Sequence, residues 1–445
     1  MSDTIIALAT PPGSSALAML RISGSHAISS TEKHLTRELQ AGKNTYSIFY
    51  KDINKTERID DVIVSAWKNP ASFTGEDIVE ISCHGNMLIT EAIIQALIQT
   101  GNGHIRHARP GEFTERAFMN GKLDLTQAEA IMDLIHARSE RALQAAQQLQ
   151  RGKLGQRIHG LQSKLLDLLA HLEAYIDFPD EDIQPEVGQS FIKKMETLLD
   201  ETRRLLSYSL EGRRIRQGVR VVLIGAPNAG KSSLLNVLIN QDRAIVSERP
   251  GTTRDTIEES IVLHGINVHF VDTAGIRKEN EAEEIEKLGI ERTYKAIEAA
   301  DLIVYVEDGT ATTHSNADIN SEILSIKVRT KADLKNFKAH EECITVSIHN
   351  DASVDHLKQE ITNVLRLCEG RSDGDLVAIN SRHEALLQEA EGALVRALSA
   401  YKTDMPPELI SSDLRIALDS WGEIVGKLTN EDMLDRLFSS FCIGK

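Results

Sequence analysis

The segment from residue 225 to residue 333 contains side chains and glycines spaced as a phosphate-binding site requires. Gly225–Ser232 matches the pattern GxxxxGK[ST] and directly follows an apolar run, Val221–Ile224. Such glycines let backbone N–H groups surround phosphates at the N-terminus of a helix. Lys231 would place a positive charge beside the β- and γ-phosphates, and the Ser232 hydroxyl would bind Mg²⁺. The sequence therefore predicts a nucleotide-phosphate loop between a strand and a helix.

Two further side chains are spaced as ligands of the metal and the γ-phosphate. Asp272 follows the apolar run Val268–Val271 and begins the segment Asp272–Gly275. An acid at such a strand end holds the Mg²⁺ shell, and a glycine N–H can contact the γ-phosphate. Thr253, between the two motifs, can close over both as part of an ordered switch. We therefore predict Ser232, Thr253 and Asp272 as the Mg²⁺ ligands.

The base is specified by a later segment, Thr330–Asp333. The Asp333 carboxylate can accept two hydrogen bonds, from the N1–H and the exocyclic amine of guanine, and adenine offers no such pair. The usual pattern begins with asparagine where this chain has Thr330, whereas Lys331 and Asp333 match it. Ser347, in the strand-like segment Ile344–Ile348, is expected beside the base. We therefore predict GTP as the nucleotide and GTP hydrolysis as the reaction.

The residue that usually orients the attacking water is absent. Ras-like switches carry glutamine directly after the glycine of Asp272–Gly275, and this chain has Ile276, which has no donor or acceptor. Asn228, inside the phosphate loop, has a side-chain oxygen that could help to bind a monovalent cation beside the phosphates. Such a cation could replace an arginine finger. The alternative is that Asn228 simply forms the turn.

The elements that must position these residues fall into four segments. Residues 1–120 mix short apolar runs with turn signals, which predicts an α+β domain. Residues 121–216 and 378–445 are helical in pattern, and residues 217–377 alternate apolar strands with helices. We therefore expect a multidomain α/β protein: one all-α domain formed from two chain segments, with a Ras-like, doubly wound P-loop GTPase domain inserted between them. Two separate helical domains are the alternative.

The helical segments are recognised by apolar residues that repeat every 3.5 residues. The three clearest runs are Leu154, Ile158, Leu161, Leu165, Leu168, Leu172 and Tyr175; Leu387, Ala390, Leu394, Ala397 and Tyr401; and Leu414, Leu418, Trp421, Val425 and Leu428. Pro179 forces a break after the first run. These runs predict long helices that pack against one another.

Bulk composition restricts the class of protein. The 445 residues carry a formal net charge of −16, so any nucleic-acid role requires a local basic patch or a basic partner. No apolar run is long enough for a membrane span, and no signal or transit peptide is evident. The four cysteines, far apart in sequence, suggest neither a zinc site nor disulfides: Cys83, Cys343, Cys368 and Cys442. We expect a cytoplasmic protein without membrane or DNA partners.

Motifs outside the nucleotide segment resemble those of a known family. They are Ala9–Gly13, Leu20–Gly24, Ser72–Asp77, Ala108–Phe113, Lys122–Leu125, Asp177–Asp180 and the tail Phe441–Lys445. Over nearly its whole length the chain resembles the MnmE (TrmE) tRNA-modification GTPases. Many small GTPases share the phosphate loop, but very few carry this N-terminus and this tail.

The resemblance implies a specific function. Members of the family dimerise through the N-terminal domain, bind a 5-formyl-tetrahydrofolate or related folate there, and act with MnmG, a flavin- and NADH-dependent protein. Together they add an aminomethyl-type group, such as carboxymethylaminomethyl, to C5 of the wobble uridine of certain tRNAs. Their GTP hydrolysis depends on potassium and on dimerisation of the GTPase domains.

The resemblance also assigns residues. The folate-contacting positions are Arg21, Glu80, Lys122 and Lys445. The potassium positions are Asn228, Ser247, Arg249 and Thr252, although Ser247 and Arg249 differ in type from the family pattern. Glu286 matches the acid that orients the attacking water, so the catalytic set is Glu286, Lys231 and Thr253. Cys442 matches the family's C-terminal cysteine and has no assigned role; a buried helical thiol is the simpler interpretation. Without the family, Arg21, Glu80 and Lys122 would each be read as surface charges.

The full set of residues expected at the nucleotide combines the motifs with the resemblance. It comprises Gly225, Asn228, Ala229, Gly230, Lys231, Ser232, Ser233, Ser247, Thr252, Thr253, Asp272, Thr273, Ala274, Gly275, Thr330, Lys331, Asp333 and Ser347.

Two other functions compete with a tRNA-modifying GTPase. One is a ribosome-assembly GTPase that acts as a binding switch, for which an appended basic RNA-binding domain is expected; this chain is acidic. The other is a stand-alone folate enzyme regulated by GTP, which would transfer one-carbon units without a flavin partner.

Overall fold

The computed structural model describes residues 3–177, 189–241, 258–272, 295–311, 323–365, 378–427, 431–439 and 441–444. The chain divides into two compact units. The first contains Met1–Met132, Gln150–Phe191 and Ala393–Lys445, and the second contains Asp133–Leu149 and Ile192–Gly392. Among the helices of the described ranges, none is long and apolar enough to cross a membrane.

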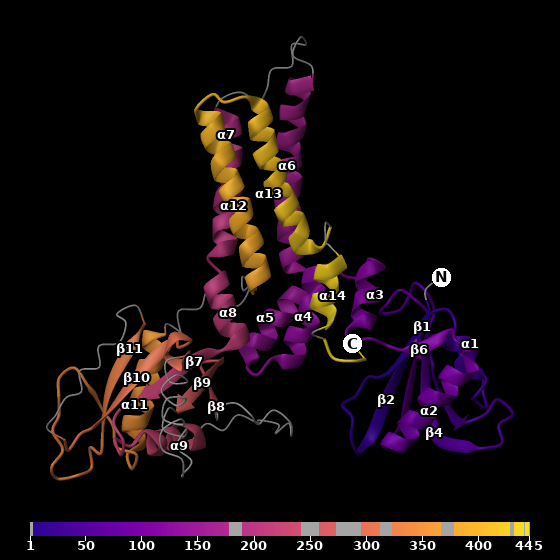
Figure 1. The fold of residues 1–445 in the computed structure, drawn as a ribbon, viewed down its shortest axis with the longest axis horizontal. Helices are drawn as coiled ribbons and strands as arrows, with labels where there is room; N and C mark the ends of the chain where they lie inside the picture. The colour runs from indigo at the N-terminus through magenta and orange to yellow at the C-terminus, as the bar shows by residue number, and fades with distance from the viewer. Residues whose placement is uncertain are drawn as a thin grey trace, which may run out of the picture. The chain divides into compact units, whose positions relative to one another are not determined.

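The N-terminal residues form a six-stranded sheet in the order β3-β4-β5-β2-β1-β6 (Figure 1). Neighbouring strands are antiparallel except β1 and β6, which are parallel. The strands are β1 (Thr4–Leu8), β2 (Ser15–Ser23), β3 (Asn44–Tyr50), β4 (Arg58–Trp67), β5 (Ile78–Gly85) and β6 (Ile105–His107). Helices α1 (Ala27–Glu32) and α2 (Met87–Thr100) complete this α+β domain.

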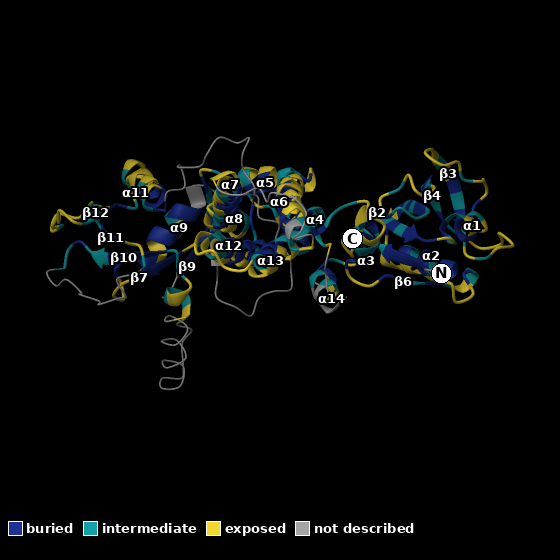
Figure 2. Cartoon of the chain, turned by 90° about the horizontal axis from the view of Figure 1, so that it is seen from above, coloured by how far each residue is buried: buried dark blue, intermediate teal, exposed yellow. Residues whose placement is uncertain are grey.

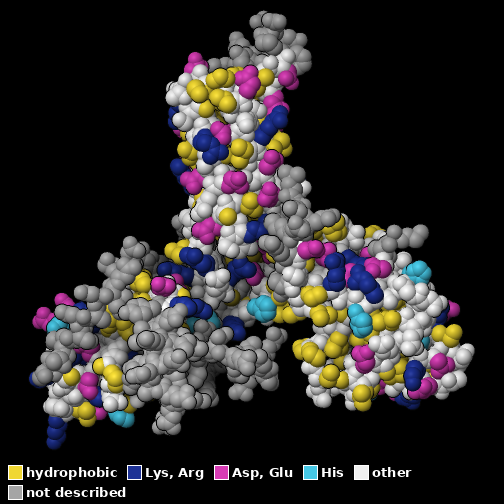
Figure 3. All heavy atoms as spheres, viewed as in Figure 1, with side chains coloured by type: hydrophobic (Ala, Val, Ile, Leu, Met, Phe, Trp, Pro, Cys, Tyr) yellow, Lys and Arg dark blue, Asp and Glu magenta, His cyan; other side chains and the backbone are white. Residues whose placement is uncertain are grey.

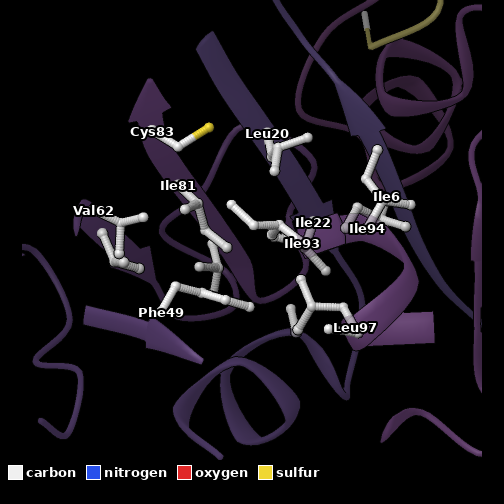
Figure 4. Close-up of a cluster of buried hydrophobic side chains, with 14 of the residues drawn as sticks. Ile6, Leu20, Ile22, Phe49, Val62, Ile81, Cys83, Ile93, Ile94 and Leu97 are labelled. Atoms are coloured by element: carbon white, nitrogen blue, oxygen red, sulfur yellow. The ribbon is translucent and has the colours of Figure 1, made fainter. Parts of the chain in front are cut away.

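Side chains along β2 point alternately to the two faces of this sheet. Ala18, Leu20 and Ile22 belong to a buried cluster with residues of α2 such as Ile93 and Leu97 (Figure 4). Successive strand side chains point to opposite faces, so the intervening residues of β2, including Arg21, lie on the other face. That second face also carries Ile5 and Ala7 of β1, which pack with Ala108 and Phe113.

Phe113 packs on that second face, and Gly444 lies against Leu8 of β1. Three short helices pack against one another beside these residues. They are α3 (Glu112–Met119), α4 (Leu125–His136) and α14 (Glu431–Ser439). Phe438 and Phe441 are buried with Leu125 and Ala128 in one apolar cluster. A Cβ on Gly111 would lie 2.5 Å from the carbonyl oxygen of Phe438, and the Gly111 amide donates to the carbonyl oxygen of Cys442 at 3.4 Å, so the end of α14 and the tail lie directly against the start of α3.

The helical elements come from both sides of the inserted domain. They are α5 (Glu140–Gln150), α6 (Lys153–Asp177), α7 (Gln189–Leu206), α8 (Ser209–Gln217), α12 (Ser381–Lys402) and α13 (Pro407–Val425). Within the first unit α6 packs along α13, and the Gln162 side chain donates to the carbonyl of Leu418. In the second unit Arg203 of α7 bonds Glu391 of α12 at 2.7 Å. The prediction of one all-α domain from two chain segments is confirmed, and Figure 2 shows the buried and exposed faces of these helices.

The inserted residues form a second six-stranded sheet in the order β12-β11-β10-β7-β9-β8. All neighbours are parallel except β8 and β9. The strands are β7 (Val219–Ile224), β8 (Glu258–Leu263), β9 (Ile266–Asp272), β10 (Leu302–Asp308), β11 (Ser325–Thr330) and β12 (Ile344–Thr345). The described helices are α9 (Lys231–Gln241) and α11 (Asp351–Val364). The predicted doubly wound domain is confirmed. The four segment boundaries remain predictions.

Candidate functional site

The predicted phosphate loop follows the central strand of the parallel sheet. β7 pairs with β9 on one side and β10 on the other, so the strand order reverses at its carboxyl end, where ligands of such sheets bind. Gly225 has φ 155°, and a Cβ there would lie 2.1 Å from the carbonyl oxygen of Val306. Asn228 and Gly230 also have positive φ, 63° and 91°. These turns give the loop a concave backbone that begins α9 at Lys231.

The Lys231 side chain lies within this loop. It is 6% exposed, and its Nζ donates to the carbonyl oxygens of Gly225 and Ala226, each at 2.8 Å. The loop therefore surrounds an ammonium group at the place where the motif requires a charge for phosphates. Asn228 is exposed in the left-handed region, which asparagine tolerates better than most residues. The turn alone is a sufficient reason for its residue type.

Thr330, the irregular residue of the base motif, fastens the phosphate loop. It is 2% exposed, and its Oγ1 lies 2.6 Å from the carbonyl oxygen of Ala229 and 3.1 Å from that of Glu307. The single hydroxyl hydrogen donates to the nearer carbonyl, that of Ala229, and so links the end of β11 to the loop. A shorter side chain than asparagine is sufficient for this link, so the departure of Thr330 from the usual pattern has a structural explanation.

The remaining base-motif residues are held by partners from neighbouring strand ends. Lys331 has φ 63°, an unfavourable conformation for a non-glycine residue, and its Nζ lies 2.6 Å from Oδ2 of Asp308. Hydrogen bonds from Lys331 and Thr310 lower the pKa of Asp308 to about 2. Asp333 is exposed, and its Oδ1 accepts from the buried Ser347 hydroxyl at 2.8 Å. This bond lowers the pKa of Asp333 and orients its carboxylate.

Several predicted nucleotide residues lie outside the described ranges. They are Ser247, Arg249, Thr252, Thr253, Thr273, Ala274, Gly275 and Glu286. The backbone of Asp272 ends β9, beside the end of β7, in register with Leu223. Ser232 and Ser233 lie in the first turn of α9 and are exposed. The structure therefore brings together the phosphate loop, the backbone of Asp272 and the base motif, and leaves the switch segments undescribed.

The residues implied at the folate site form a second charged group, on the N-terminal sheet. Arg21 and Glu80 are register partners on β2 and β5, and their side chains form an ion pair at 2.7 Å. Arg21 also donates to the carbonyl oxygen of Gly444 at 3.3 Å. Its guanidinium carbon lies 5.9 Å from the ring centroid of Phe73 and 5.8 Å from that of Phe113. Cation–π contacts of this kind hold the guanidinium between the rings.

The loop that carries Phe73 is fixed by a network of charged groups. Arg116 bonds Glu76 at 3.0 Å and Glu112 at 3.0 Å, and Ser23 donates to Glu76 at 2.8 Å. Burial raises the pKa of Glu112, but hydrogen bonds from Arg106, the Arg109 amide and Arg116 outweigh it and hold that pKa at about 2. The network thus joins α3, the loop Ser72–Asp77 and the end of β2.

Lys122 lies near the same loop. Its Nζ donates to the carbonyl oxygen of Pro70 at 2.9 Å, and its stem would be 3.3 Å from a Cβ on Gly75. Lys445 lies outside the described residues, whereas Gly444 is buried with φ 94° and packs against Leu8. The structure therefore gathers Arg21, Glu80 and the tail directly, and connects Lys122 to them through this loop.

An apolar cavity of about 690 Å³ adjoins the tail. Its lining includes Ile6, Leu8, Met87, Leu88, His107 and Ile443. Ile443 contributes to this cavity, and the next carbonyl accepts from Arg21. Cys442 is half-buried and lies after α14 rather than in a helix, so the helical part of its simpler interpretation is wrong.

Sequence reasoning missed several residues of both sites. Asp308 pairs with Lys331, and Ser353 accepts the Ser347 amide at 3.0 Å. Phe73 and Phe113 flank Arg21. Asp308 ends an apolar strand, as Asp272 does, and that position was a usable signal. The aromatic pair had none, because its members are 40 positions apart and are brought together only around Arg21 in the folded domain.

The sheet order, the loop at its central strand and the polar residues at that edge define a P-loop GTPase domain. Family models match two long stretches: "MnmE helical domain" over residues 125–442 and "GTP-binding protein TrmE N-terminus" over residues 4–122. The chain belongs to the MnmE family of tRNA modification GTPases.

Named relatives support the same assignment along the whole chain. The tRNA modification GTPase MnmE of Moorella thermoacetica is 40% identical over 477 aligned residues, covering 100% of both chains. That of Akkermansia muciniphila is 40% identical over 453 residues, covering 99% of both. A solved structure of an Era variant from Aquifex aeolicus, bound to GDP.AlF4-, covers 39% of this chain and 66% of its own at 22% identity, with a TM-score of 0.26. So low a score supports no conclusion about this chain.

Proposed function

We propose that this protein hydrolyses GTP and that this hydrolysis serves the modification of tRNA. The observation that carries the proposal is the convergence of the phosphate loop, the base motif and Ser347 at one edge of the parallel sheet in a member of the MnmE family. The loop residues would hold the phosphates, and Asp333 would select guanine.

The chain's own residues have separable roles in this reaction. Lys231 exchanges its two carbonyl partners for phosphate oxygens, so that its charge opposes the negative charge of the γ-phosphate. Thr330 keeps the loop at a constant distance from β11, and Ser347 presents the Asp333 carboxylate to the base. Ser232, Asp272 and Thr253 would hold Mg²⁺, which when bound neutralises phosphate charge.

Potassium activation is a further part of the proposal. Asn228, Ser247, Arg249 and Thr252 would supply oxygen ligands, and Glu286 would orient water in place of the missing glutamine. The exposed left-handed Asn228 lies on the loop where such an ion would meet the phosphates. Hydrolysis by the purified protein should be at least several-fold faster in KCl than in NaCl at equal ionic strength. Equal rates would exclude the potassium mechanism.

The tRNA reaction is proposed to occur at C5 of the wobble uridine, together with an MnmG-like flavoprotein. Deletion of the gene should remove the aminomethyl or carboxymethylaminomethyl group, as measured by mass spectrometry of tRNA nucleosides. Intact modification would contradict the tRNA role and favour a ribosome-assembly switch, which predicts altered ribosome profiles instead. One-carbon transfer without the flavoprotein would favour the stand-alone folate enzyme.

A folate is proposed to bind beside the tail on the N-terminal sheet. Arg21 and Lys122 offer cations for its glutamate carboxylates, Glu80 offers a carboxylate for the pterin amine, and the cavity beside Ile443 offers apolar contact. Arg21→Gln should weaken binding of 5-formyl-tetrahydrofolate about tenfold by losing one charged contact. Arg37→Gln is a matched control because Arg37 is exposed and lies outside this group. Equal losses in both variants would exclude Arg21 as a ligand.

Two properties complete the proposal. The protein is proposed to act in the cytoplasm as a homodimer formed through the N-terminal domain. Exposed apolar side chains on that domain, including Leu17, Met87 and Leu88, are compatible with such an interface. Light scattering of the full chain should give twice the mass of one chain.

A further inference from the structure

A polar pocket lies in the unit that contains the GTPase domain, away from the nucleotide edge of the sheet. We name it the α8 pocket; its volume is about 270 Å³, and its lining includes His136, Arg138, Ser139, Arg216, Asn267 and His269. These residues come from three places: the end of α4 with the turn that follows it, the end of α8, and β9. None of the roles assigned above uses this pocket.

The charge of the α8 pocket is opposite to that of the chain. The protein has a formal net charge of −16, yet this lining contains two arginines and two histidines and, among the described residues that form it, no carboxylate. Lys and Arg side chains gather over α8 and α5 in Figure 3. A local excess of positive charge in an acidic protein is better explained by binding of an anionic ligand than by a general contribution to solubility.

The arginines retain capacity to bind an anion. Arg216 pairs through Nη2 with Oδ1 of Asp133 at 2.6 Å, and its side chain remains 25% exposed. Its Nε is buried and has no hydrogen-bond partner among the described residues. Arg138 is exposed and forms no ion pair with the described part of the chain. Asp133 therefore pairs with the guanidinium of Arg216, whereas the described residues show no ion pair for that of Arg138, whose donors face solvent.

The pocket is preorganised by close backbone packing. Gly218 has φ 78°, and a Cβ there would lie 2.4 Å from the carbonyl oxygen of Asn267 and 3.0 Å from the His269 ring. The Asn267 amide nitrogen and His269 Nε2 are 3.0 Å apart. Arg141 of α5 pairs with Glu211 of α8 at 3.3 Å. Preorganised donors lose little conformational entropy when a ligand binds.

We propose that the α8 pocket binds a phosphate group, held by Arg138 and Arg216 with support from Ser139 and the two histidines. Guanidinium groups match the geometry of phosphate oxygens and bind them through paired hydrogen bonds. The phosphate can belong to an RNA backbone or be a free phosphate ion, since the same donors recognise both. The proposal is independent of the proposed GTPase function, because the pocket shares no residue with the nucleotide site.

The test uses the full chain saturated with GDP, so that the phosphate loop is occupied. Fluorescence anisotropy with labelled tRNA compares wild type, Arg138→Gln and the matched control Arg213→Gln, which removes an exposed charge of α8 that does not line the pocket. We expect Arg138→Gln to weaken tRNA binding about tenfold. The slope of the logarithm of the binding constant against the logarithm of the salt concentration should fall in magnitude by about one, as for one lost phosphate contact. The control should change affinity less than about twofold. Equal melting temperatures verify that all three proteins are folded.

Calorimetry of inorganic phosphate on the same GDP-bound proteins distinguishes the two sources. Loss of tRNA affinity in Arg138→Gln, with or without loss of phosphate binding, identifies an RNA phosphate. Loss of phosphate binding with unchanged tRNA affinity identifies the free ion. Either result supports the proposal. Equal binding by wild type and Arg138→Gln in both assays overturns it, as does an equal effect of Arg213→Gln or no binding of either ligand by wild type.

Discussion

Charged groups are positioned in different ways at two sites of this protein. One is the nucleotide edge of the parallel sheet, and the other is the Arg21 face, which is the face of the N-terminal sheet on which Arg21 lies. At the first, most functional groups come from loops that directly follow strands, and each motif is contiguous in the chain. At the second, Arg21 projects from the middle of β2, and its partners Glu80 and Gly444 are 59 and 423 positions away. One site is thus assembled from local turns, the other from long-range pairing.

This difference predicts different consequences of mutation. The nucleotide loop depends on backbone geometry, so changing one side chain should affect the ligand more than the fold. The Arg21 face depends on the Glu112–Arg116–Glu76 network, in which carboxylates and guanidinium groups are largely buried. Breaking a buried pair leaves a charge uncompensated, so a change there should affect stability first.

The largest effect is expected at Lys231. Lys231→Ala removes the charge that opposes the γ-phosphate and should lower kcat for GTP hydrolysis about a thousandfold, because a preorganised charge at a reacting phosphate contributes several kcal/mol. Phosphate release assays measure it. The melting temperature should change little. Lys335→Ala, an exposed lysine in the same domain, is the control and should retain full activity. A large loss of stability in Lys231→Ala would contradict the expectation that side-chain changes at the nucleotide loop affect the ligand more than the fold.

Glu112 tests the expectation that changes in the buried charge network of the Arg21 face affect stability first. Glu112→Gln should reduce the free energy of unfolding by about 3 kcal/mol at pH 7, because Arg106 and Arg116 lose a buried partner. The pKa of Glu112 is held at about 2, below its ordinary value of 4.5, so its stabilisation is complete above pH 4.5 and is lost as the pH falls towards 2. The difference between wild type and variant should shrink over that window in chemical denaturation.

Glu57→Gln provides the control for Glu112. Glu57 pairs with Lys51 on the surface, with side chains 64% and 56% exposed, and such pairs contribute little. We expect a change below about 0.5 kcal/mol. If Glu112→Gln is equally mild, the N-terminal network does not hold the Arg21 face as proposed.

Asp333 tests whether a side chain at the nucleotide edge determines which base is bound. Asp333→Asn should weaken GTP binding about fiftyfold, because two hydrogen bonds to a charged acceptor are lost. Xanthine, which presents a carbonyl where guanine has its amine, should bind the variant better than guanine does. Titration with fluorescent nucleotides measures both affinities. Asp351→Asn, at the first turn of α11, is the control and should leave base selectivity unchanged. Unchanged selectivity in Asp333→Asn would refute the assignment of Asp333 to the base.

The smallest effect is expected at Thr330. Thr330→Val keeps the volume but loses the hydroxyl that donates to the Ala229 carbonyl, so GTP affinity should fall about fivefold to tenfold. Thr330→Ser should restore most of it by restoring the hydroxyl. Equal affinity of the valine variant would show that the phosphate loop holds its shape without this link.

Much of the fold was predictable because it rests on local pattern. Apolar repeats of 3.5 residues indicated α6, α12 and α13, and buried apolar runs indicated β7, β9 and β10. The prediction of a strand over residues 344–348 was too long, because β12 is only Ile344–Thr345 and Ser347 turns towards Asp333 instead. A hydrogen bond across 14 positions decides that turn, and no local pattern records it.

For the nucleotide site, the amino-acid sequence by itself determined the loop, the order of the motifs and the choice of guanine, because contiguous residues with fixed backbone preferences form each part. Only the tertiary structure decided what Thr330 does, since its partner Ala229 is 101 positions away. It alone also placed Phe73, Phe113 and Gly444 around Arg21. Strand pairing and the docking of the tail bring those groups together, and both depend on burial that is shared by distant segments of the chain.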